Sequence, residues 1–285
     1  MNTASGAVVG RQLARFGRPQ NALYPGLLAA GVALLGGASL LGAIACVPLL
    51  FCLYALAAGY NNLQDVATDR LNKRRDNPLV AGQVPKFARI AFFIANSSVV
   101  LLLQLALAQP ASLALSASWL LLAYAYSSPR LRLQARSWLA PVVLGACYGA
   151  LPLVIGAAQG WPLAGQAVLL LAVLQIFLLA PTLLAKDYKD ATGDRATGKR
   201  TPLVRHGAKM VGLVAVSMAL VTAAGYASVT VYLGGPLALA TTAGAVYLAF
   251  CSLLHSRRGN ISPPLRKAGS ALLLCMSLYL YTLTR

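Results

Sequence analysis

The chain has 285 residues, of which 58% are hydrophobic and 11% are charged, and its mean hydropathy is +0.68. Globular domains carry about 25% charged residues, so this composition excludes an ordinary soluble protein. Lys and Arg number 24 against six acidic residues, which gives a net charge of +18. In a chain this apolar we attribute the excess to membrane orientation, and we expect a lipid bilayer as partner and no nucleic acid.

Apolar stretches predict nine transmembrane helices, because a helix needs about 20 residues to cross a bilayer. Gly36 and Gly37 separate the first two spans, since one unbroken helix there would be too long for a single crossing. The predicted spans are 21–37, 40–63, 87–107, 111–127, 138–157, 164–185, 208–225, 232–254 and 266–283. They leave no room for a separate soluble domain, so we expect residues 1–285 to form one all-α domain, a polytopic nine-helix membrane bundle.

The basic residues indicate how this bundle is oriented. They gather before the first span and after the second, fourth, sixth and eighth spans, whereas the other connections, near Gly37, Gln109, Gly160 and Gly234, carry no charge. Short cytoplasmic loops are enriched in Lys and Arg. The pattern therefore predicts a cytoplasmic N-terminus and an outer C-terminus, in a cell inner membrane. No convincing cleavage site follows the N-terminal basic residues, so we expect the first helix to be retained.

The acidic residues are confined to two short windows on the predicted cytoplasmic side. Glu is absent, and the six carboxylates are Asp65, Asp69, Asp76, Asp187, Asp190 and Asp194. Ionisable groups at a membrane are costly and are functional candidates by default. Ordinary loop ion pairs are the alternative, but they do not explain why carboxylates occur nowhere else. The sequence therefore predicts a cytoplasmic-side active site.

Spacing within each window suggests metal binding. Asn61, Asp65 and Asp69 are four residues apart, and on a helix they would drift by only about 40° per step and line one face over ~12 Å. The three carboxylates of the second window would lie within about 60° of one another if helical. Carboxylates this close repel unless a cation neutralises them. Hard oxygen ligands favour Mg²⁺, which keeps several waters and binds substrate phosphates. A diphosphate would fit between two such stripes.

These motifs resemble those of the UbiA superfamily of intramembrane prenyltransferases. The first motif of that superfamily falls on Asn61, Asp65 and Asp69, and a later Pro-Leu and Gly pattern falls on Pro78, Leu79 and Gly82. Its second motif matches Lys186, Asp187, Asp190, Gly193, Asp194, Arg195, Gly198, Lys199 and Thr201. Arg18-Pro19 and the Tyr126 to Pro129 stretch are also similar. The chain departs from many members at Asn62, Asn77 and Thr182, and none of these departures touches the expected metal ligands.

The resemblance implies a Mg²⁺-dependent prenyltransferase, with two Mg²⁺ ions or Mn²⁺ in their place. It would transfer a prenyl group from an allylic isoprenoid diphosphate to a lipophilic acceptor, of an aromatic or quinone type. The expected metal ligands are Asn61, Asp65, Asp69, Asp187, Asp190 and Asp194, with Asp65 and Asp190 as catalytic residues. The expected diphosphate-binding residues are Arg75, Lys186, Lys189, Arg195, Lys199 and Arg200.

The prenyl or acceptor pocket needs an apolar chamber and aromatic rings, which shield an allylic cation from water. Candidates are Asn21, Tyr54, Tyr60, Tyr124, Tyr126 and Tyr148, with Trp138, although each ring could instead serve in packing or in the interfacial belt. No Lys or Arg lies within a predicted span, which favours a neutral or phenolic acceptor unless a loop arginine reaches into the chamber.

Two alternatives to prenyl transfer stay open. A UbiA-type terpene cyclase would act on the allylic diphosphate alone, and the motifs do not separate it from a transferase. A membrane transporter with a cytoplasmic metal site would need a polar pathway, yet the outer halves of the spans carry no charged residue.

Overall fold

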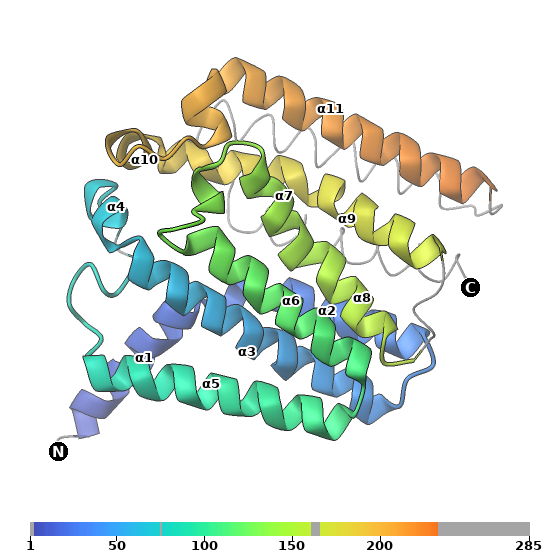
Figure 1. Ribbon diagram of the computed structural model, residues 1–285, viewed down its shortest axis with the longest axis horizontal. Helices are drawn as coiled ribbons and strands as arrows, with labels where there is room; N and C mark the ends of the chain where they lie inside the picture. The colour runs from blue at the N-terminus through green and yellow to red at the C-terminus, as the bar shows by residue number, and fades with distance from the viewer. Residues whose placement is uncertain (1–2, 75, 161–165, 233–285) are drawn as a thin grey trace.

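The computed structural model describes residues 3–74, 76–160 and 166–232, and in these ranges the chain is helical, with one isolated β-bridge between Arg136 and Arg200. Figure 1 shows long helices gathered into a bundle, with the short helices α4 and α10 together at one end. The elements in chain order are α1 (Thr3–Gly17), η1 (Pro19–Asn21), α2 (Leu23–Leu35), α3 (Leu40–Gln64), α4 (Val66–Leu71), α5 (Lys86–Leu107), α6 (Pro110–Ser127), η2 (Leu133–Ala135), α7 (Leu139–Gly145), the π-helical turn η3 (Ala146–Ala150), α8 (Leu151–Ala157), α9 (Gln166–Ala185), η4 (Lys186–Lys189), α10 (Ala191–Ala196) and α11 (Pro202–Tyr232).

The first seven predicted spans fall in the described part of the chain, apart from residues 164 and 165 of the sixth, and the described residues of each are largely helical. Four helical stretches there are long and apolar enough to cross a membrane: Leu40–Gln64, Lys86–Leu107, Leu139–Ala157 and Pro202–Thr222. Leu23–Leu35 and Val168–Ala180 are shorter apolar helices. The last two predicted spans lie outside the described residues, beyond residue 232.

The ends of the helices follow local sequence signals. α2 ends at Gly36, and Gly37 adopts a positive φ of 84°, so the predicted break between the first two spans is confirmed. Ser39 then starts α3, because its hydroxyl oxygen accepts a hydrogen bond from the backbone N–H of Gly42 at 3.1 Å. After the C-terminal end of α5, Pro110 occupies the first turn of α6. The N–H that proline lacks would have no partner within the helix at this position, so proline is tolerated there.

Two features of the helices differ from the prediction. No helix was expected before residue 21, yet α1 occupies Thr3–Gly17 and packs on α3 and α5. Its apolar anchor is Phe16, which is buried edge-on against Phe92 at 5.2 Å between ring centroids. α1 is amphipathic and not a continuous apolar stretch, which explains why a search for spans misses it. α11 also begins earlier than predicted, and Gly207, with φ of 77°, interrupts it.

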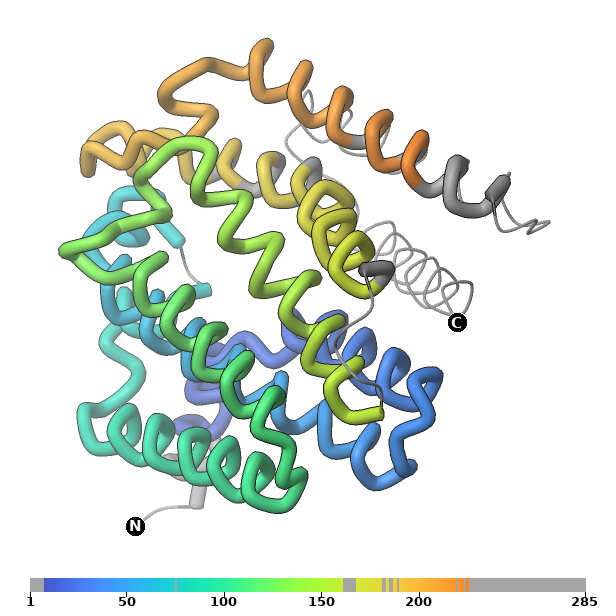
Figure 2. The backbone as a smooth tube through the Cα atoms, turned by 45° about the vertical axis from the view of Figure 1, so that its right-hand side comes forward, coloured from blue at the N-terminus to red at the C-terminus, as the bar shows by residue number. Residues whose placement is uncertain are grey.

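The helices pack closely enough to enclose a core. α2 lies against both α3 and α8, and α9 lies against α11. The α2–α8 contact requires Gly156, since a Cβ there would come 2.3 Å from the carbonyl oxygen of Ala29. On α5, Ile94, Leu102 and Leu105 face outward and are exposed, as expected for a surface that contacts lipid. The turned view of Figure 2 again places α4 and α10 at one end, where the aspartate windows lie.

Candidate active site

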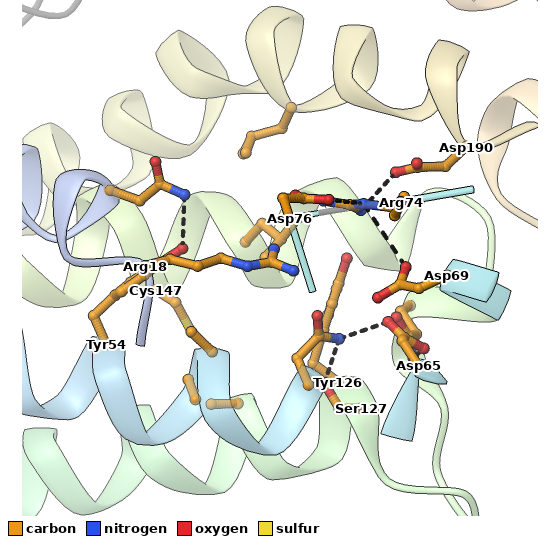
Figure 3. Close-up of a pocket in the computed structure, with 18 of the residues that line it drawn as sticks. Arg18, Tyr54, Asp65, Asp69, Arg74, Asp76, Tyr126, Ser127, Cys147 and Asp190 are labelled. Carbon is orange, nitrogen blue, oxygen red and sulfur yellow. Dashed lines mark hydrogen bonds and ion pairs between the residues drawn. The ribbon is translucent and has the colours of Figure 1, made fainter. Parts of the chain in front are cut away.

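One cavity of about 1060 Å³ receives residues from both aspartate windows. Its lining comes from α1, α3, α4, α6, the α7–η3 segment, η4 and α10. Among the predicted site residues it contacts Asn21, Tyr54, Asn61, Asp65, Asp69, Tyr126, Tyr148, Asp187, Asp190, Asp194 and Lys199. Figure 3 shows the aspartates at one side of this cavity and Tyr54 at the other, with Arg18 between them.

The first aspartate segment bends where a single helical stripe was predicted. α3 ends at Gln64, and Asp65, with φ and ψ of −94° and 6°, lies between α3 and α4. The side-chain amide of Asn61 donates to Asp65 Oδ2 at 2.9 Å and to Ser127 Oγ at 3.1 Å. Asn61, Asp65 and Asp69 all reach the cavity despite the bend. The prediction of one continuous helix through the first aspartate window is therefore wrong. The helix is interrupted at Asp65, which is the last cap residue of α3 and the first cap residue of α4.

The second aspartate segment is also not one helix. A 3₁₀ turn, η4, contains Asp187, and Asp190 then precedes α10 with φ and ψ of −102° and −2°. Asp187 and Asp194 are both buried. The three carboxylates nevertheless line the same cavity, because the turn and the short helix present them from successive positions.

The two aspartate segments have the same local backbone structure. α4 and α10 are both six residues long, and each begins directly after an aspartate, Asp65 or Asp190. A second aspartate, Asp69 or Asp194, lies four residues further on inside each helix. Residues 66–71 and 191–196 are thus equivalent, with a constant offset in residue number of 125.

The equivalence continues past the helix ends. Lys73 and Gly198 both adopt positive φ, 52° and 70°. Each is followed by a cationic residue, Arg74 or Lys199, whose backbone N–H donates at 2.8 Å to the carbonyl of the second aspartate in its own segment. The left-handed residue turns the chain back, so that each cation returns toward its own helix.

The contacts between the two segments follow the same equivalence of positions. Thr68 Oγ1 lies 3.4 Å from Thr197 Oγ1, and the backbone N–H of Gly193 donates to Asn72 Oδ1 at 2.6 Å. Thr68 is equivalent to Gly193 and Asn72 to Thr197, so the two contacts join equivalent positions across an approximate two-fold relation. Gly193 is required here, since a Cβ would come 2.5 Å from Asn72 Oδ1.

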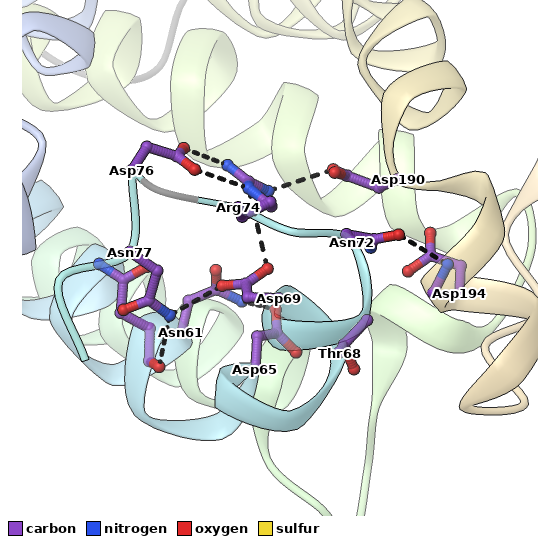
Figure 4. A network of polar contacts seen from close by, with 12 residues as sticks. Asn61, Asp65, Thr68, Asp69, Asn72, Arg74, Asp76, Asn77, Asp190 and Asp194 are labelled. Carbon is purple, nitrogen blue, oxygen red and sulfur yellow. Dashed lines mark hydrogen bonds and ion pairs between the residues drawn. The ribbon is translucent and has the colours of Figure 1, made fainter. Parts of the chain in front are cut away.

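Arg74 joins the two segments from one side. Its guanidinium lies 3.1 Å from Asp190 Oδ2 and 3.8 Å from Asp69 Oδ1, and it also donates twice to Asp76 (Figure 4). This guanidinium lowers the pKa of Asp76 to about 2, whereas burial raises the pKa of Asp69. Sequence reasoning chose the adjacent Arg75, whose position lies outside the described residues.

Lys199 joins the segments from the other side. Its ammonium lies 2.8 Å from Asp65 Oδ1 and 4.0 Å from Asp194 Oδ1. Gln134 completes the group by donating to Asp65 Oδ1 at 3.1 Å and by accepting from Lys199 at 3.3 Å. Gln134 lies in η2, remote in sequence from both windows, and no pattern around it marks a site.

The opposite side of the cavity combines hydrogen-bonded tyrosine hydroxyls with aromatic and aliphatic side chains. Tyr54 OH accepts hydrogen bonds from Tyr148 OH at 2.6 Å and from the side-chain amide of Asn21 at 3.1 Å. Tyr148 and Cys147 reach the cavity from η3. A π-helical turn disturbs the regular helical bonding, and the indole N–H of Trp119 donates to the Cys147 carbonyl at 2.7 Å. Trp119 therefore holds the turn that positions Tyr148.

Arg18 is a site residue that was not predicted as one, although Arg18-Pro19 was noted as a family-like pair. It has a positive φ of 49°, and its guanidinium donates to the side-chain oxygen of buried Asn62. Its Nε is buried without a hydrogen-bond partner. Arg11 and Arg15 line the same cavity, and their helical spacing identifies one face of α1. Arg18 lies outside the predicted spans and lines the cavity, so it is the loop arginine that the preference for a neutral acceptor left open.

The remaining predicted residues lie elsewhere. Tyr60 and Tyr124 stack on each other at 5.4 Å between centroids and do not line the cavity, and Trp138 stacks on His206. Arg195 and Arg200 are exposed and also do not line it. The side chains of Lys186 and Lys189 lie outside the described residues.

The sequence is similar to a known protein family and to proteins of that family. The chain matches the description "UbiA prenyltransferase family" over residues 22–280. It is 34% identical to chlorophyll synthase of Oryza sativa subsp. japonica over 109 residues, which are 37% of this chain and 29% of that protein. It is 30% identical to the bacteriochlorophyll synthase 33 kDa chain of Cereibacter sphaeroides over 183 residues, 63% of this chain and 58% of that protein. The matches thus span less than two thirds of these relatives.

Solved structures share the fold over nearly the full length. A UbiA homologue from Archaeoglobus fulgidus, bound to DMAPP and Mg²⁺, has a TM-score of 0.70 at 19% identity and covers 95% of this chain and 99% of its own. The apo structure of a UbiA homologue from Aeropyrum pernix K1 has a TM-score of 0.70 at 22% identity, with coverages of 92% and 96%. Because the family match extends over most of the sequence and the helical fold agrees with it, this chain belongs to the UbiA prenyltransferase family.

Proposed function

We propose that this protein catalyses the Mg²⁺-dependent transfer of a prenyl group from an allylic isoprenoid diphosphate to a lipophilic acceptor, with release of diphosphate. The observation that carries the proposal is the single cavity, which has two aspartate segments at one side and hydrogen-bonded tyrosines at the other. A charged headgroup and an isoprenoid chain need such opposite surroundings. The A. fulgidus homologue is described as bound to DMAPP or GPP together with Mg²⁺, which supports this substrate class.

The donor set fits Mg²⁺. Asp190 Oδ1 is buried without a hydrogen-bond partner, as a side-chain oxygen reserved for a cation would be. Among the described residues, no group of three or more Asp, Glu, His or Cys side chains is arranged to hold a metal ion by itself. Mg²⁺ is commonly bound by one or two carboxylates with substrate phosphates completing its coordination, so a metal diphosphate suits this site better than a free ion.

We assign the two ions to the two segments, with Mn²⁺ able to replace Mg²⁺. Asn61, Asp65 and Asp69 would contribute ligands to one ion and Asp187, Asp190 and Asp194 to the other, with diphosphate oxygens completing the coordination of both. When bound, Mg²⁺ neutralises the charge that develops on the departing diphosphate. Asp65 and Asp190 are the proposed catalytic residues, because each lies at the bend directly before the short helix of its segment and lines the cavity.

We assign separate side chains to the diphosphate and to the isoprenoid chain of the substrate. Arg74 and Lys199 are close enough to the carboxylates to contact diphosphate oxygens, and guanidinium and ammonium groups form strong charge-assisted hydrogen bonds with phosphate. The rings of Tyr54, Tyr126 and Tyr148 line the cavity and would shield an allylic cation from water.

The acceptor is proposed as a lipophilic molecule that enters beside α1. An aromatic or quinone-type acceptor fits the apolar lining, and Arg18 also provides a cation for an acceptor that carries an anionic group. The curated relatives are named chlorophyll and bacteriochlorophyll synthases, so precursors of such pigments belong among the acceptors to be tested.

Cyclisation of the allylic diphosphate is the second candidate, favoured by the tyrosine rings along the cavity. The deciding experiment incubates purified protein with Mg²⁺ and C10 to C20 allylic diphosphates, with and without membrane lipid extract or pigment precursors. Transfer predicts a product whose mass is the sum of prenyl group and acceptor, formed only when acceptor is present. A hydrocarbon or terpene alcohol formed without acceptor would establish cyclisation, and no consumption of any diphosphate would contradict both.

The active site is proposed to face the cytoplasm, with a cytoplasmic N-terminus in the cell inner membrane. Gln83 and Gln109 are exposed in connections at opposite ends of α5, one within the basic loop and one within an uncharged loop. A charged thiol reagent should label Gln83→Cys only from the cytoplasmic side and Gln109→Cys only from the other side. The unsubstituted chain measures the background labelling of its five native cysteines, of which Cys46, Cys52 and Cys147 are buried and Cys251 and Cys275 lie outside the described residues. Labelling of both variants from one side would contradict this topology.

A further inference from the structure

The ion pairs of the site are crossed between the two aspartate segments. Arg74 follows the first segment, yet it lies closer to Asp190 of the second, at 3.1 Å, than to Asp69 of its own, at 3.8 Å. Lys199 follows the second segment and lies 2.8 Å from Asp65 of the first, but 4.0 Å from an aspartate of its own segment. Each cation therefore contacts the opposite segment more closely.

The crossed pairs join equivalent positions. Arg74 and Lys199 correspond under the offset of 125 residues, and so do their partners Asp190 and Asp65. An ordinary surface ion pair would not be duplicated in this way, and both cations are largely buried, with side-chain exposures of 19% and 7%. Both cations contact the same carboxylates that the proposed function assigns to Mg²⁺. Side-chain cations and metal ions therefore oppose each other at these carboxylates. Lys199 occupies Asp65 Oδ1, whereas Arg74 holds Asp190 Oδ2 and repels a cation at the unpartnered Oδ1 of the same carboxylate.

We propose that Arg74 and Lys199 are a matched pair of exchangeable counter-ions, which hold the two aspartate segments together and oppose the binding of metal without diphosphate. Metal diphosphate offers each cation a new anionic partner, so that it can leave the opposite aspartate and contact a phosphate oxygen. The pair thus makes the site selective for metal and diphosphate together over the free metal. This inference rests on the proposed metal-binding function and adds a positioning role for two residues of the same site.

The test measures metal and diphosphate binding separately in the purified full-length protein. Free Mn²⁺ is followed by electron paramagnetic resonance, first alone and then with inorganic diphosphate. Arg74→Gln and Lys199→Gln should each tighten the binding of Mn²⁺ alone by about tenfold, because each substitution removes a positive charge that repels the metal at a distance of a few ångströms from its proposed ligands. The same variants should weaken the Mn²⁺-dependent binding of diphosphate.

Charge-conserving and surface variants provide the controls. Arg74→Lys and Lys199→Arg should keep the affinity for Mn²⁺ alone within a few-fold of the unsubstituted protein, and they also serve if a glutamine variant fails to fold. Arg70→Ala removes an exposed arginine of α4 that does not line the cavity, and it should change neither binding reaction. This control separates local ion pairing from a general change in net charge.

Three results would count against the inference in different ways. If both glutamine variants bound Mn²⁺ alone no more tightly than the unsubstituted protein, the exchange of counter-ions would be overturned while the metal site stood. If the conservative variants alone are obtained, tightening of Mn²⁺ binding in them would overturn it equally. If the unsubstituted protein bound no Mn²⁺ even with diphosphate, the proposed function itself would fail, and this inference with it.

Discussion

The two sides of the cavity use different kinds of polar interaction. At the aspartate side, charged groups compensate one another, as in the pairs of Arg74 with Asp190 and of Lys199 with Asp65. At the tyrosine side the hydrogen bonds are between uncharged groups, Tyr148 to Tyr54 and Trp119 to a backbone carbonyl. The charged side belongs to short helices and turns beyond the long helices, whereas the uncharged side lies within the long helices.

This difference reflects the cost of burying charge in a membrane. An ionised side chain inside the hydrocarbon region is expensive, whereas a hydrogen-bonded hydroxyl is tolerated. A substrate with a charged head and an apolar chain can then be aligned by the contrast alone. The comparison predicts that changes at the aspartate side abolish metal-dependent chemistry, and that changes at the tyrosine side alter the fit of the chain.

The largest expected effect follows the loss of a carboxylate at either bend. Asp65→Ala and Asp190→Ala should each reduce turnover by at least about a hundredfold. Each variant removes a proposed ligand of the Mg²⁺ that stabilises the negative charge of the departing diphosphate. Size-exclusion profiles in detergent should stay unchanged. Asp76→Asn is the matched control, because Asp76 is the half-exposed carboxylate outside the two repeats, and its loss should cost only a few-fold. Near-normal rates in either alanine variant would refute the metal assignment.

Removal of metal should stop the reaction as completely. Excess chelator should abolish turnover, and added Mg²⁺ or Mn²⁺ should restore it, because hard oxygen sites of this kind exchange their ions with solvent. Tyr148→Phe, which alters only the tyrosine side, should require the same Mg²⁺ concentration as the unsubstituted protein. Turnover that persists in excess chelator, or a changed Mg²⁺ requirement in Tyr148→Phe, would remove the distinction between the two sides.

A moderate effect is expected from the tyrosine side. Tyr148→Phe keeps the ring and removes the hydroxyl that donates to Tyr54, so turnover should fall only a few-fold. Tyr148→Ala should enlarge this part of the cavity and shift the preferred allylic diphosphate toward longer chains. Competition between C10, C15 and C20 diphosphates, read by product mass, measures the shift. An unchanged preference in Tyr148→Ala would show that another part of the cavity sets chain length.

The smallest effect on the chemistry should come from the support behind Tyr148. Trp119→Phe leaves the buried Cys147 carbonyl without its indole donor, which should lower the free energy of unfolding by about 1–3 kcal/mol. Thermal denaturation in detergent measures this loss, and Ser118→Ala on the exposed face of the same helix is the control. Catalysis at a temperature well below the transition should change little. A stability equal to that of the Ser118→Ala variant would show that the π-helical turn holds itself.

Local sequence patterns were enough to predict the all-helical membrane class, the break between the first two spans, and the two aspartate windows that line the cavity. Hydrophobic segments of the length of a bilayer are a local property, and so is the concentration of every carboxylate in two short stretches. The separation of α2 from α3 at Gly36 and Gly37 followed from the same local signals.

The residues that surround the cavity, and the cations that neutralise its aspartates, could be identified only from the packing of the folded chain. Arg18 and Gln134 reach the site from segments whose own patterns suggest a basic end and a loop, because their roles depend on chain packing over long sequence separations. The contacts of Arg74 with both aspartate segments, and the stacking of Tyr60 on Tyr124 outside the cavity lining, depend on how the chain turns after each helix. The crossed pairing of Arg74 and Lys199 arises only when α4 and α10 lie side by side, because each cation then lies closer to an aspartate of the opposite segment than to one of its own segment.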